Sequence, residues 1–346
     1  MATSEASPSG RWISAESARG WGARFLKRGG ILIPFLALFL TLSLVSEPFA
    51  TKGNMLNILD QQSATLIIAA AGTLVLVAGG IDLSVGAVYG FAAVTAANLG
   101  LSHSAGFSFA VAIGAGLLIG FVNGLVVTVL RINSLIATLA MSFIITGCSG
   151  LMTGGNLLIL FDKPAFADLA RTHFLGVKTS IWVMVAAVVV LALLLSATTV
   201  GRYMYASGGN AVAARLAGVR VDWIRILTFT ISGAAAGLAG VIDTSNVLTA
   251  QAGNYETLTF TVLAGIVVGG TSILGGEGAV WQTVVGVLFI ALIGNGYLLL
   301  ALDPLYEQIT LGVLLLAAVG LDALARGLLR PGAAIKQLLR RRPRAP

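Results

Sequence analysis

The chain has 346 residues, of which 57% are hydrophobic and only 10% are charged, with a mean hydropathy of +0.94. Soluble globular domains carry about 25% charged residues, so this composition excludes an ordinary soluble protein and indicates repeated crossing of a lipid bilayer. The net charge of +7 does not predict a nucleic-acid partner, because the basic residues lie in loops and tails between apolar runs. The single cysteine, Cys148, excludes an intrachain disulfide and a cysteine-based metal site, and we expect no metal or cofactor.

Apolar runs of about 20 residues, the length that crosses a bilayer, recur along the chain. They predict an all-α fold, a polytopic transmembrane helix bundle of about ten spans. The ten segments are 31–48, 62–80, 82–101, 107–130, 134–153, 180–200, 226–246, 257–275, 279–300 and 306–325. Eight spans would remain if 62–101 formed a re-entrant pair. The first apolar run is long and lacks a small-residue cleavage site, so it is interpreted as a span and not as a signal peptide.

Lysine and arginine are distributed unequally between the two sides of this bundle. With the N-terminus inside, 17 of the 21 Lys and Arg residues fall on inner segments, and only Lys52, Lys163, Arg171 and Lys178 fall outside. Cytoplasmic loops carry the excess of basic residues, so this pattern predicts that both termini are cytoplasmic (N-in, C-in). We expect a cytoplasmic N-terminal tail over 1–30, a transmembrane domain over 31–325 and a basic cytoplasmic C-terminal tail over 326–346.

The inner segment 201–225 is the most informative stretch outside the spans. Gly208 and Gly209 are expected to break the preceding helix, Asn210 is a favourable N-cap, and Ala211–Ala217 is strongly helix-forming before Gly218. A helix this short cannot bury a core of its own. We therefore expect a cytoplasmic docking element for another protein.

Glycine is abundant, with 43 residues, and several glycines within the predicted spans are four residues apart. Such spacing lets helix backbones approach closely, as expected for Gly116, Gly120 and Gly124 and for the pair Gly233 and Gly237. A second pattern is an internal echo, in which residues 76–88 and 267–280 each contain a Gly-Gly break followed by polar residues. Transporters often contain repeats whose broken helices lie near the substrate path, although two short Gly-rich matches can also arise by chance.

No catalytic signature occurs in the sequence, which has no G-x-x-x-x-G-K-[ST] loop and no H-E-x-x-H motif, so we expect a protein that is not an enzyme. Polar residues within the spans are the candidates for a solute path, since each is costly in a bilayer. The candidate path residues are Asp82, Ser84, Asn123, Thr138, Ser142, Thr146 and Asn295. Thr138, Ser142 and Thr146 share one helix face. The alternatives are that Asp82 caps the next helix together with Ser84, and that Ser, Thr and Asn only hold helices together.

Four stretches, in order over about 31–325, resemble the permease subunits of bacterial ATP-binding-cassette importers for monosaccharides of the ribose, xylose and galactose type. They are Gly79–Gly86 (GGIDLSVG), Phe121–Gly124 (FVNG) with Arg131–Ala140 (RINSLIATLA), Gly201–Gly218 (GRY, GGN and AARLAG), and Val268–Ser272 (VGGTS) with Gly275–Gly278 (GGEG).

This resemblance implies a permease domain that works with a second permease copy, two ATPase domains and an external solute-binding protein in a bacterial inner membrane. In such permeases a helix of the central cytoplasmic loop inserts into a groove of the ATPase. The residues that match it here are Gly209, Asn210, Ala213, Ala214, Arg215 and Gly218. Val212 stands where the importer pattern has Glu, which removes a salt bridge from that position and leaves Arg215 as the polar contact.

Other classes of transporter remain as alternatives. Permeases for branched-chain amino acids or nucleosides share a related plan. A secondary carrier coupled to protons or sodium would need no ATPase, but it usually needs buried ionisable relays that are nearly absent here. An integral membrane enzyme would need a convergent set of acids, bases or ligands near an interface.

Overall fold

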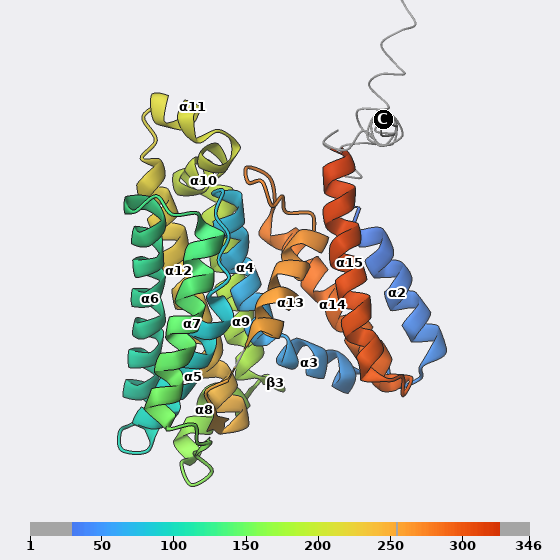
Figure 1. The fold of residues 1–346 in the computed structure, drawn as a ribbon. Helices are drawn as coiled ribbons and strands as arrows, with labels where there is room; N and C mark the ends of the chain where they lie inside the picture. Colours follow the sequence, from blue (N-terminus) through green and yellow to red (C-terminus); the bar gives the residue numbers. More distant parts are fainter. Residues whose placement is uncertain (1–29, 254, 326–346) are drawn as a thin grey trace, which may run out of the picture.

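The structure is a computed structural model, which describes residues 30–253 and 255–325, and the predicted tails 1–30 and 326–346 lie almost entirely outside them. Its described part is nearly all helical (Figure 1). The first half contains α2 (Leu32–Val45), α3 (Lys52–Gln61), α4 (Ser63–Val77), α5 (Val85–Gly100), α6 (Ala105–Val129), α7 (Ser134–Thr153) and α8 (Pro164–Arg171). The second half contains α9 (Thr179–Ala197), α10 (Thr199–Gly209), α11 (Ala211–Leu216), α12 (Val221–Val247), α13 (Glu256–Val268), α14 (Val280–Leu299) and α15 (Pro304–Ala325).

Apolar helices occupy the positions of all ten predicted spans. Among the described residues, α6, α7, α9, α12 and α14 are long and apolar enough to cross a membrane, and the pair α3 and α4, bent by 52°, makes a sixth crossing if it is one span. Four shorter apolar helices, α2, α5, α13 and part of α15, account for the remaining positions. The all-α membrane bundle is confirmed.

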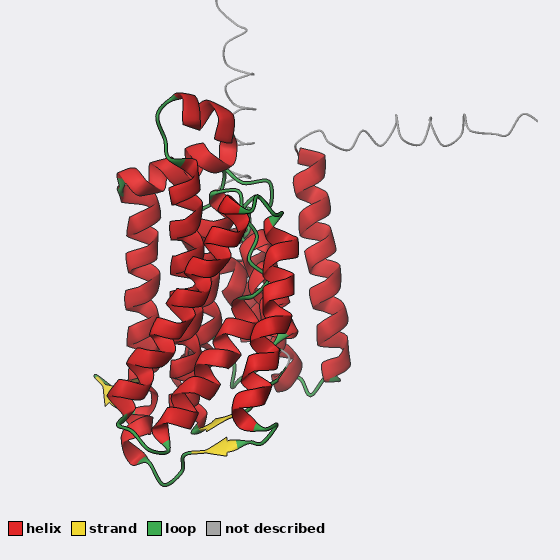
Figure 2. Cartoon of the chain, turned by 60° about the vertical axis from the view of Figure 1, so that its left-hand side comes forward, coloured by secondary structure: helices red, strands yellow, loops and turns green. Residues whose placement is uncertain are grey.

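The two ends of the bundle differ in the elements they carry. Helices α10 and α11 and the end of α15 lie at one end, which is the side that the charge asymmetry assigns to the cytoplasm (Figure 1). The opposite, outer end carries α8 (Figure 1) and the short strands (Figure 2). There β1 (Leu158–Ile159) pairs antiparallel with β4 (Thr249–Ala250), and β2 (His173–Phe174) pairs with β3 (Val177–Lys178).

Helix α4 forms the centre of the bundle. It is apolar on all sides, and every one of its residues except Ala64 is buried, because it packs against α12, α9, α13 and α14. The hydroxyl of Thr73 contacts that of Thr283 on α14, with 2.7 Å between the two Oγ1 atoms. A helix without a polar face is stable in this position because neighbours cover it all round.

Helices α6 and α12 pack through glycine, as the four-residue spacing predicts. A Cβ added at Gly116 would lie 2.5 Å from the carbonyl oxygen of Gly233, and one added at Gly120 would lie 2.3 Å from that of Phe229. Real Cβ atoms do not approach a carbonyl this closely, so the two backbones touch directly. The predicted small-residue faces are therefore confirmed as a helix-helix contact.

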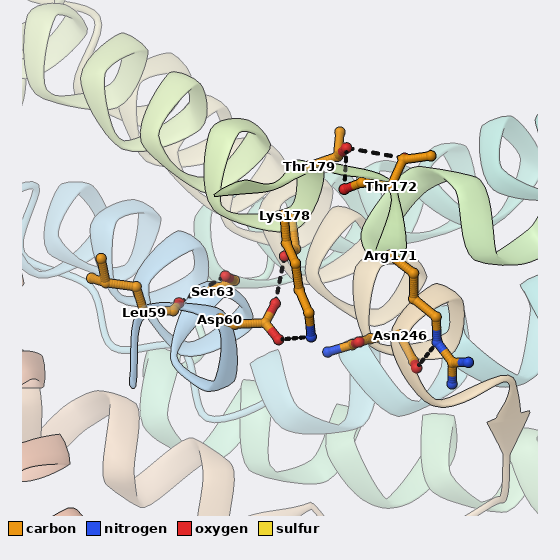
Figure 3. Close-up of polar contacts among 9 residues, drawn as sticks. Leu59, Asp60, Ser63, Arg171, Thr172, Lys178, Thr179 and Asn246 are labelled. Carbon is orange, nitrogen blue, oxygen red and sulfur yellow. Dashed lines mark hydrogen bonds and ion pairs between the residues drawn. The ribbon is translucent and has the colours of Figure 1, made fainter. Parts of the chain in front are cut away.

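The outer end is braced where α3 meets α4 (Figure 3). The carboxylate of Asp60, which is buried, accepts hydrogen bonds from Lys178 Nζ and from Ser180 Oγ, each at 2.5 Å. Arg171 Nε donates to the carbonyl oxygen of Asn246 at 2.6 Å. These contacts tie the bend in the first half of the chain and the end of α12 to the outer loop.

Candidate coupling surface and translocation pathway

The short cytoplasmic helix forms as the sequence predicts. The Asn210 side chain accepts a hydrogen bond from Ala213 N at 3.0 Å, α11 ends at Leu216, and Gly218 has a positive φ of 86°. What the sequence did not predict is α10. The preceding span ends at Ala197, and the Thr198 side chain caps a separate helix that runs to Gly209, because it accepts a hydrogen bond from Gly201 N at 3.1 Å.

Helix α11 presents exposed apolar side chains at the end of the bundle that carries α10 and α11. Val212 is 70% exposed and Leu216 is 86% exposed, and the two share a face because they are four residues apart. Ala214 is the buried residue of this helix. Arg215 makes an exposed ion pair with Asp222 at 2.6 Å, which positions α11 against the start of α12.

The two Gly-Gly breaks of the internal echo have the same backbone structure. After α4, Gly79 N donates to Leu76 O and Gly80 N to Val75 O; after α13, Gly270 N donates to Val267 O and Thr271 N to Ile266 O. Gly79 and Gly270 both have positive φ, of 82° and 100°. Glycine is favoured at the end of each helix because, without a Cβ atom, it adopts this conformation without strain. The echo is thus a repeated helix ending.

Helix α10 ends between these two breaks, in a cluster of touching backbones that we call the glycine junction (Gly79, Gly208, Gly275 and Gly276). A Cβ added at Gly208 would lie 1.9 Å from the carbonyl oxygen of Val77 and 2.7 Å from Gly276 N. One added at Gly275 would lie 2.9 Å from Gly79 Cα. Gly276 N also donates to Val77 O at 2.9 Å. The helix that leads into α11 is therefore in backbone contact with both broken segments.

A tyrosine reinforces this contact. The hydroxyl of Tyr205 on α10 donates to the carbonyl oxygen of Gly278 at 2.6 Å. Burial raises the pKa of Tyr205 above its ordinary value, so the hydroxyl stays protonated and keeps its role as donor at neutral pH.

Asp82 lies in a hydrogen-bonded network just beyond the first break. Its Oδ1 accepts from Ser84 N at 3.0 Å and from Ser84 Oγ at 2.6 Å, and its Oδ2 accepts from Ser232 Oγ of α12 at 2.8 Å. Asn123 Nδ2 of α6 donates to Ser84 Oγ at 2.8 Å. Thr138 Oγ1 of α7 accepts from Leu83 N at 2.9 Å. The network thus joins the irregular segment 80–84 to three helices, and Asp82 binds Ser84, the residue before α5, although no side chain caps α5 itself.

The predicted polar face of α7 is divided by the tertiary structure. Thr138 is fully buried in this network, whereas Ser142 and Thr146 line a separate cavity of about 220 Å³ between α7 and α13. The cavity is lined by Leu83, Ala87, Leu139, Ser142, Phe143, Thr146, Tyr255, Glu256, Thr259 and Phe260. Tyr255, Glu256 and Thr259 were not among the predicted path residues. The only signal for them in the sequence was the threonine-rich start of the predicted span 257–275.

Asn295, the remaining candidate path residue, lies elsewhere. Its side-chain amide exchanges two hydrogen bonds with that of Asn54, at 2.9 and 3.0 Å, so it joins α14 to α3.

A larger cavity, of about 590 Å³, opens beside the first Gly-Gly break, at the end of the bundle that carries α11. Arg131, Arg215 and Arg225 line it together with Asp222, Gly79 and Gly80. Within the described part of the chain, Nε of Arg225 is buried without a hydrogen-bond partner. This end of the molecule therefore concentrates positive charge next to α11 and the glycine junction.

Comparison with known proteins identifies the class to which this architecture belongs. Residues 54–319 match the family described as the permease component of the branched-chain amino acid transport system, and the chain belongs to this family of multi-pass membrane permeases.

Curated relatives of the chain are permeases of sugar and signal-molecule importers. The ribose import permease protein RbsC of Escherichia coli (strain K12) is 35% identical over 253 residues, which are 72% of this chain and 79% of RbsC. The L-arabinose ABC transporter permease protein AraH of Azospirillum brasilense is 36% identical over 271 residues, 78% of this chain and 79% of AraH.

The autoinducer 2 import system permease protein LsrC of Yersinia enterocolitica is 33% identical over 259 residues, 73% of this chain and 71% of LsrC. No solved structure matches the chain. The chain is therefore a permease of the ATP-binding-cassette importer class, as its resemblance predicts.

Proposed function

We propose that this permease moves a monosaccharide or similar polyol into a bacterial cell across the inner membrane, driven by a separate ATPase subunit. The relatives named for ribose and arabinose import support the solute class. The chain supplies the passage and no chemistry. An external solute-binding protein delivers the solute, and a second copy of the permease completes the transporter.

The observation that carries the proposal is the exposed apolar face of α11 at the cytoplasmic end. Two large apolar side chains, Val212 and Leu216, are costly to leave in water and suit a groove on another protein. The matched coupling residues surround this face. The proposed roles are an N-cap for Asn210, close approach of the ATPase for Gly209 and Ala213, packing of α11 against the permease for the buried Ala214, a rim contact for Arg215 and a helix stop for Gly218.

Movement of α11 can be passed through α10 to the helices of the transmembrane bundle. Gly208 touches both broken segments, so displacement of α10 presses on the ends of α4 and α13. Asp82 and Ser84 hold the first broken segment to α12 and α6. We propose that closure of the ATPase pair tilts these helices as packed units and changes the side to which the solute passage opens.

The test is binding of the importer's own ATPase subunit to the purified permease. We expect Leu216→Asp to abolish binding, because a charge replaces the apolar contact. Leu175→Asp is the matched control, since Leu175 is also highly exposed but lies in the outer hairpin. Equal binding by native protein and Leu216→Asp would reject α11 as the docking element.

The solute is tested separately by ATP-dependent uptake into proteoliposomes that contain the assembled importer. Uptake of D-ribose or L-arabinose is the expected result. Uptake of leucine instead would support the branched-chain amino acid alternative, and uptake that needs an ion gradient but no ATPase would support a secondary carrier.

A further inference from the structure

The cavity between α7 and α13 is unusual because it combines a carboxylate with irregular backbone at membrane depth. Helix α13 has 13 residues and is therefore about 20 Å long, too short for a hydrocarbon core of about 30 Å. It begins at Glu256, with Tyr255 as its N-cap, and it ends at the second Gly-Gly break, so at least one of its two ends lies within the hydrocarbon core. Irregular backbone at this depth is tolerated only where it is buried in protein or lines a polar cavity.

The start of α13 is held rigidly by α5. Thr259 Oγ1 accepts a hydrogen bond from Gly86 N at 3.1 Å, and the ring of Tyr255 packs edge-on against Tyr89 with 5.2 Å between ring centroids. A Cβ added at Gly90 would lie 2.3 Å from that ring. These contacts use the hydroxyl of Thr259 for structure and fix the position from which Glu256 faces the cavity.

Three further polar side chains line the cavity, and the hydroxyl of one of them, Ser142, also donates to the carbonyl oxygen of Leu139 at 2.7 Å. Ser142 and Thr146 stand one turn apart on α7, and Glu256 lies opposite them in the first turn of α13. Phe143 and Phe260 are exposed at its margin and give it an apolar rim. A carboxylate and two hydroxyls below apolar rings suit a molecule with hydroxyls along its edge and C–H groups on its faces. At about 220 Å³ the cavity is below the range of drug-sized sites, which fits a small solute.

We propose that this cavity is a weak binding site for a polyhydroxylated solute during its passage, with Ser142, Thr146 and Glu256 as its hydrogen-bonding groups. The proposal rests on the proposed function. A site with so few polar groups holds the solute loosely, which permits release to the cytoplasm. The solute crosses without chemical change.

The first experiment compares two substitutions at one position. Thr146→Val keeps the shape but removes the hydroxyl, whereas Thr146→Ser keeps the hydroxyl. We expect Thr146→Val and Glu256→Gln each to lower the amount of D-ribose or L-arabinose moved per ATP hydrolysed by about tenfold, the effect of losing about one hydrogen bond to a substrate hydroxyl. Thr146→Ser should retain most transport. Ser149→Ala, on the same helix but outside the cavity, is the control.

The second experiment does not depend on transport. Cys148 is the chain's one cysteine, so Cys148→Ser gives a background without thiols. In that background Thr146→Cys should react with a hydrophilic methanethiosulfonate, and D-ribose or L-arabinose should slow the reaction. Val190→Cys, exposed on the outer surface of α9, should not react because lipid covers it.

The outcomes separate this proposal from the proposed function. Failure of the native complex to move either sugar with ATP would reject the proposed function, while protection of Thr146→Cys by sugar would still support the cavity as a sugar site. If native protein transports sugar, and Thr146→Val and Thr146→Ser move equal amounts of sugar per ATP hydrolysed, the cavity is rejected as a solute site while the proposed function stands. Protection by leucine and not by sugar would overturn the solute class.

Discussion

Glycine brings backbones together at two places in this molecule, and the two places differ in what surrounds them. Along α6 and α12, glycines such as Gly120 and Gly233 lie inside regular helices and join two long, continuous rods. In the glycine junction, Gly79 follows the end of α4 whereas Gly275 and Gly276 lie in the loop between α13 and α14, and all three have positive φ. The contact between α6 and α12 makes a rigid unit. The glycine junction instead joins the end of α10 to two non-helical segments, at which the helices on either side can change their relative direction.

The difference predicts different consequences for substitution. A side chain added between α6 and α12 must separate two helices along their length, so it should lower the free energy of unfolding. A side chain added in the glycine junction displaces the end of α10 relative to the segments that follow α4 and α13. It should therefore mainly weaken the coupling of ATP hydrolysis to transport.

The largest expected effect is at α6. Gly120→Leu should lower the free energy of unfolding by about 3 kcal/mol, because the side chain has no space against the backbone of α12. The measurement is thermal or denaturant unfolding in detergent. Gly114→Leu is the control on the same helix, since nothing lies within 4 Å of a Cβ there. Similar losses at both positions would contradict the direct backbone contact.

The next effect concerns the glycine junction. Gly208→Ala should reduce ATP-driven transport by about tenfold, since about 1.4 kcal/mol of strain on one conformation shifts an equilibrium by that factor. Gly114→Ala is the control, because a Cβ added at this glycine of α6 has nothing within 4 Å. Transport and ATP hydrolysis are measured together in proteoliposomes. Equal transport per ATP hydrolysed in Gly208→Ala and its control would contradict a role of the glycine junction in coupling.

A smaller effect is expected in the network behind the junction. Asp82→Leu leaves the hydroxyls of Ser84 and Ser232 without their acceptor and should cost about 1–3 kcal/mol of stability. Asp82→Asn keeps an acceptor oxygen and should lose less. Unfolding in detergent measures both. If Asp82→Leu proved as stable as native protein, the network would not brace the first broken segment.

The smallest effect is expected at the cap of α11. Asn210→Ala removes the hydrogen bond to Ala213 N and should destabilise this helix by about 1 kcal/mol. If the ATPase binds the folded helix, its affinity falls about fivefold. Asn210→Asp retains the cap and should bind like native protein. Titration of the ATPase subunit against each variant checks this, and equal affinity for Asn210→Ala would contradict the role of the cap.

Local features of this protein were readable from the sequence because they depend on neighbouring residues. Hydrophobic runs located the membrane helices, the Asn210 to Gly218 pattern located α11, and the four-residue glycine spacing located the face on which α6 meets α12. The repeated helix endings at the two Gly-Gly breaks also left a visible trace. Each follows from hydropathy, capping or backbone conformation within a few residues.

Only the tertiary structure decided how these pieces combine. Thr138, Ser142 and Thr146 share one face by helical period, yet only the last two reach a cavity, because segment 80–84 covers the first. The irregular start of α13 brought Glu256 to the same cavity, and Gly208 met Gly79 and Gly275 from far along the chain. Spacing along one helix says nothing about what packs against it, so contacts between distant segments depend on how the whole bundle is packed.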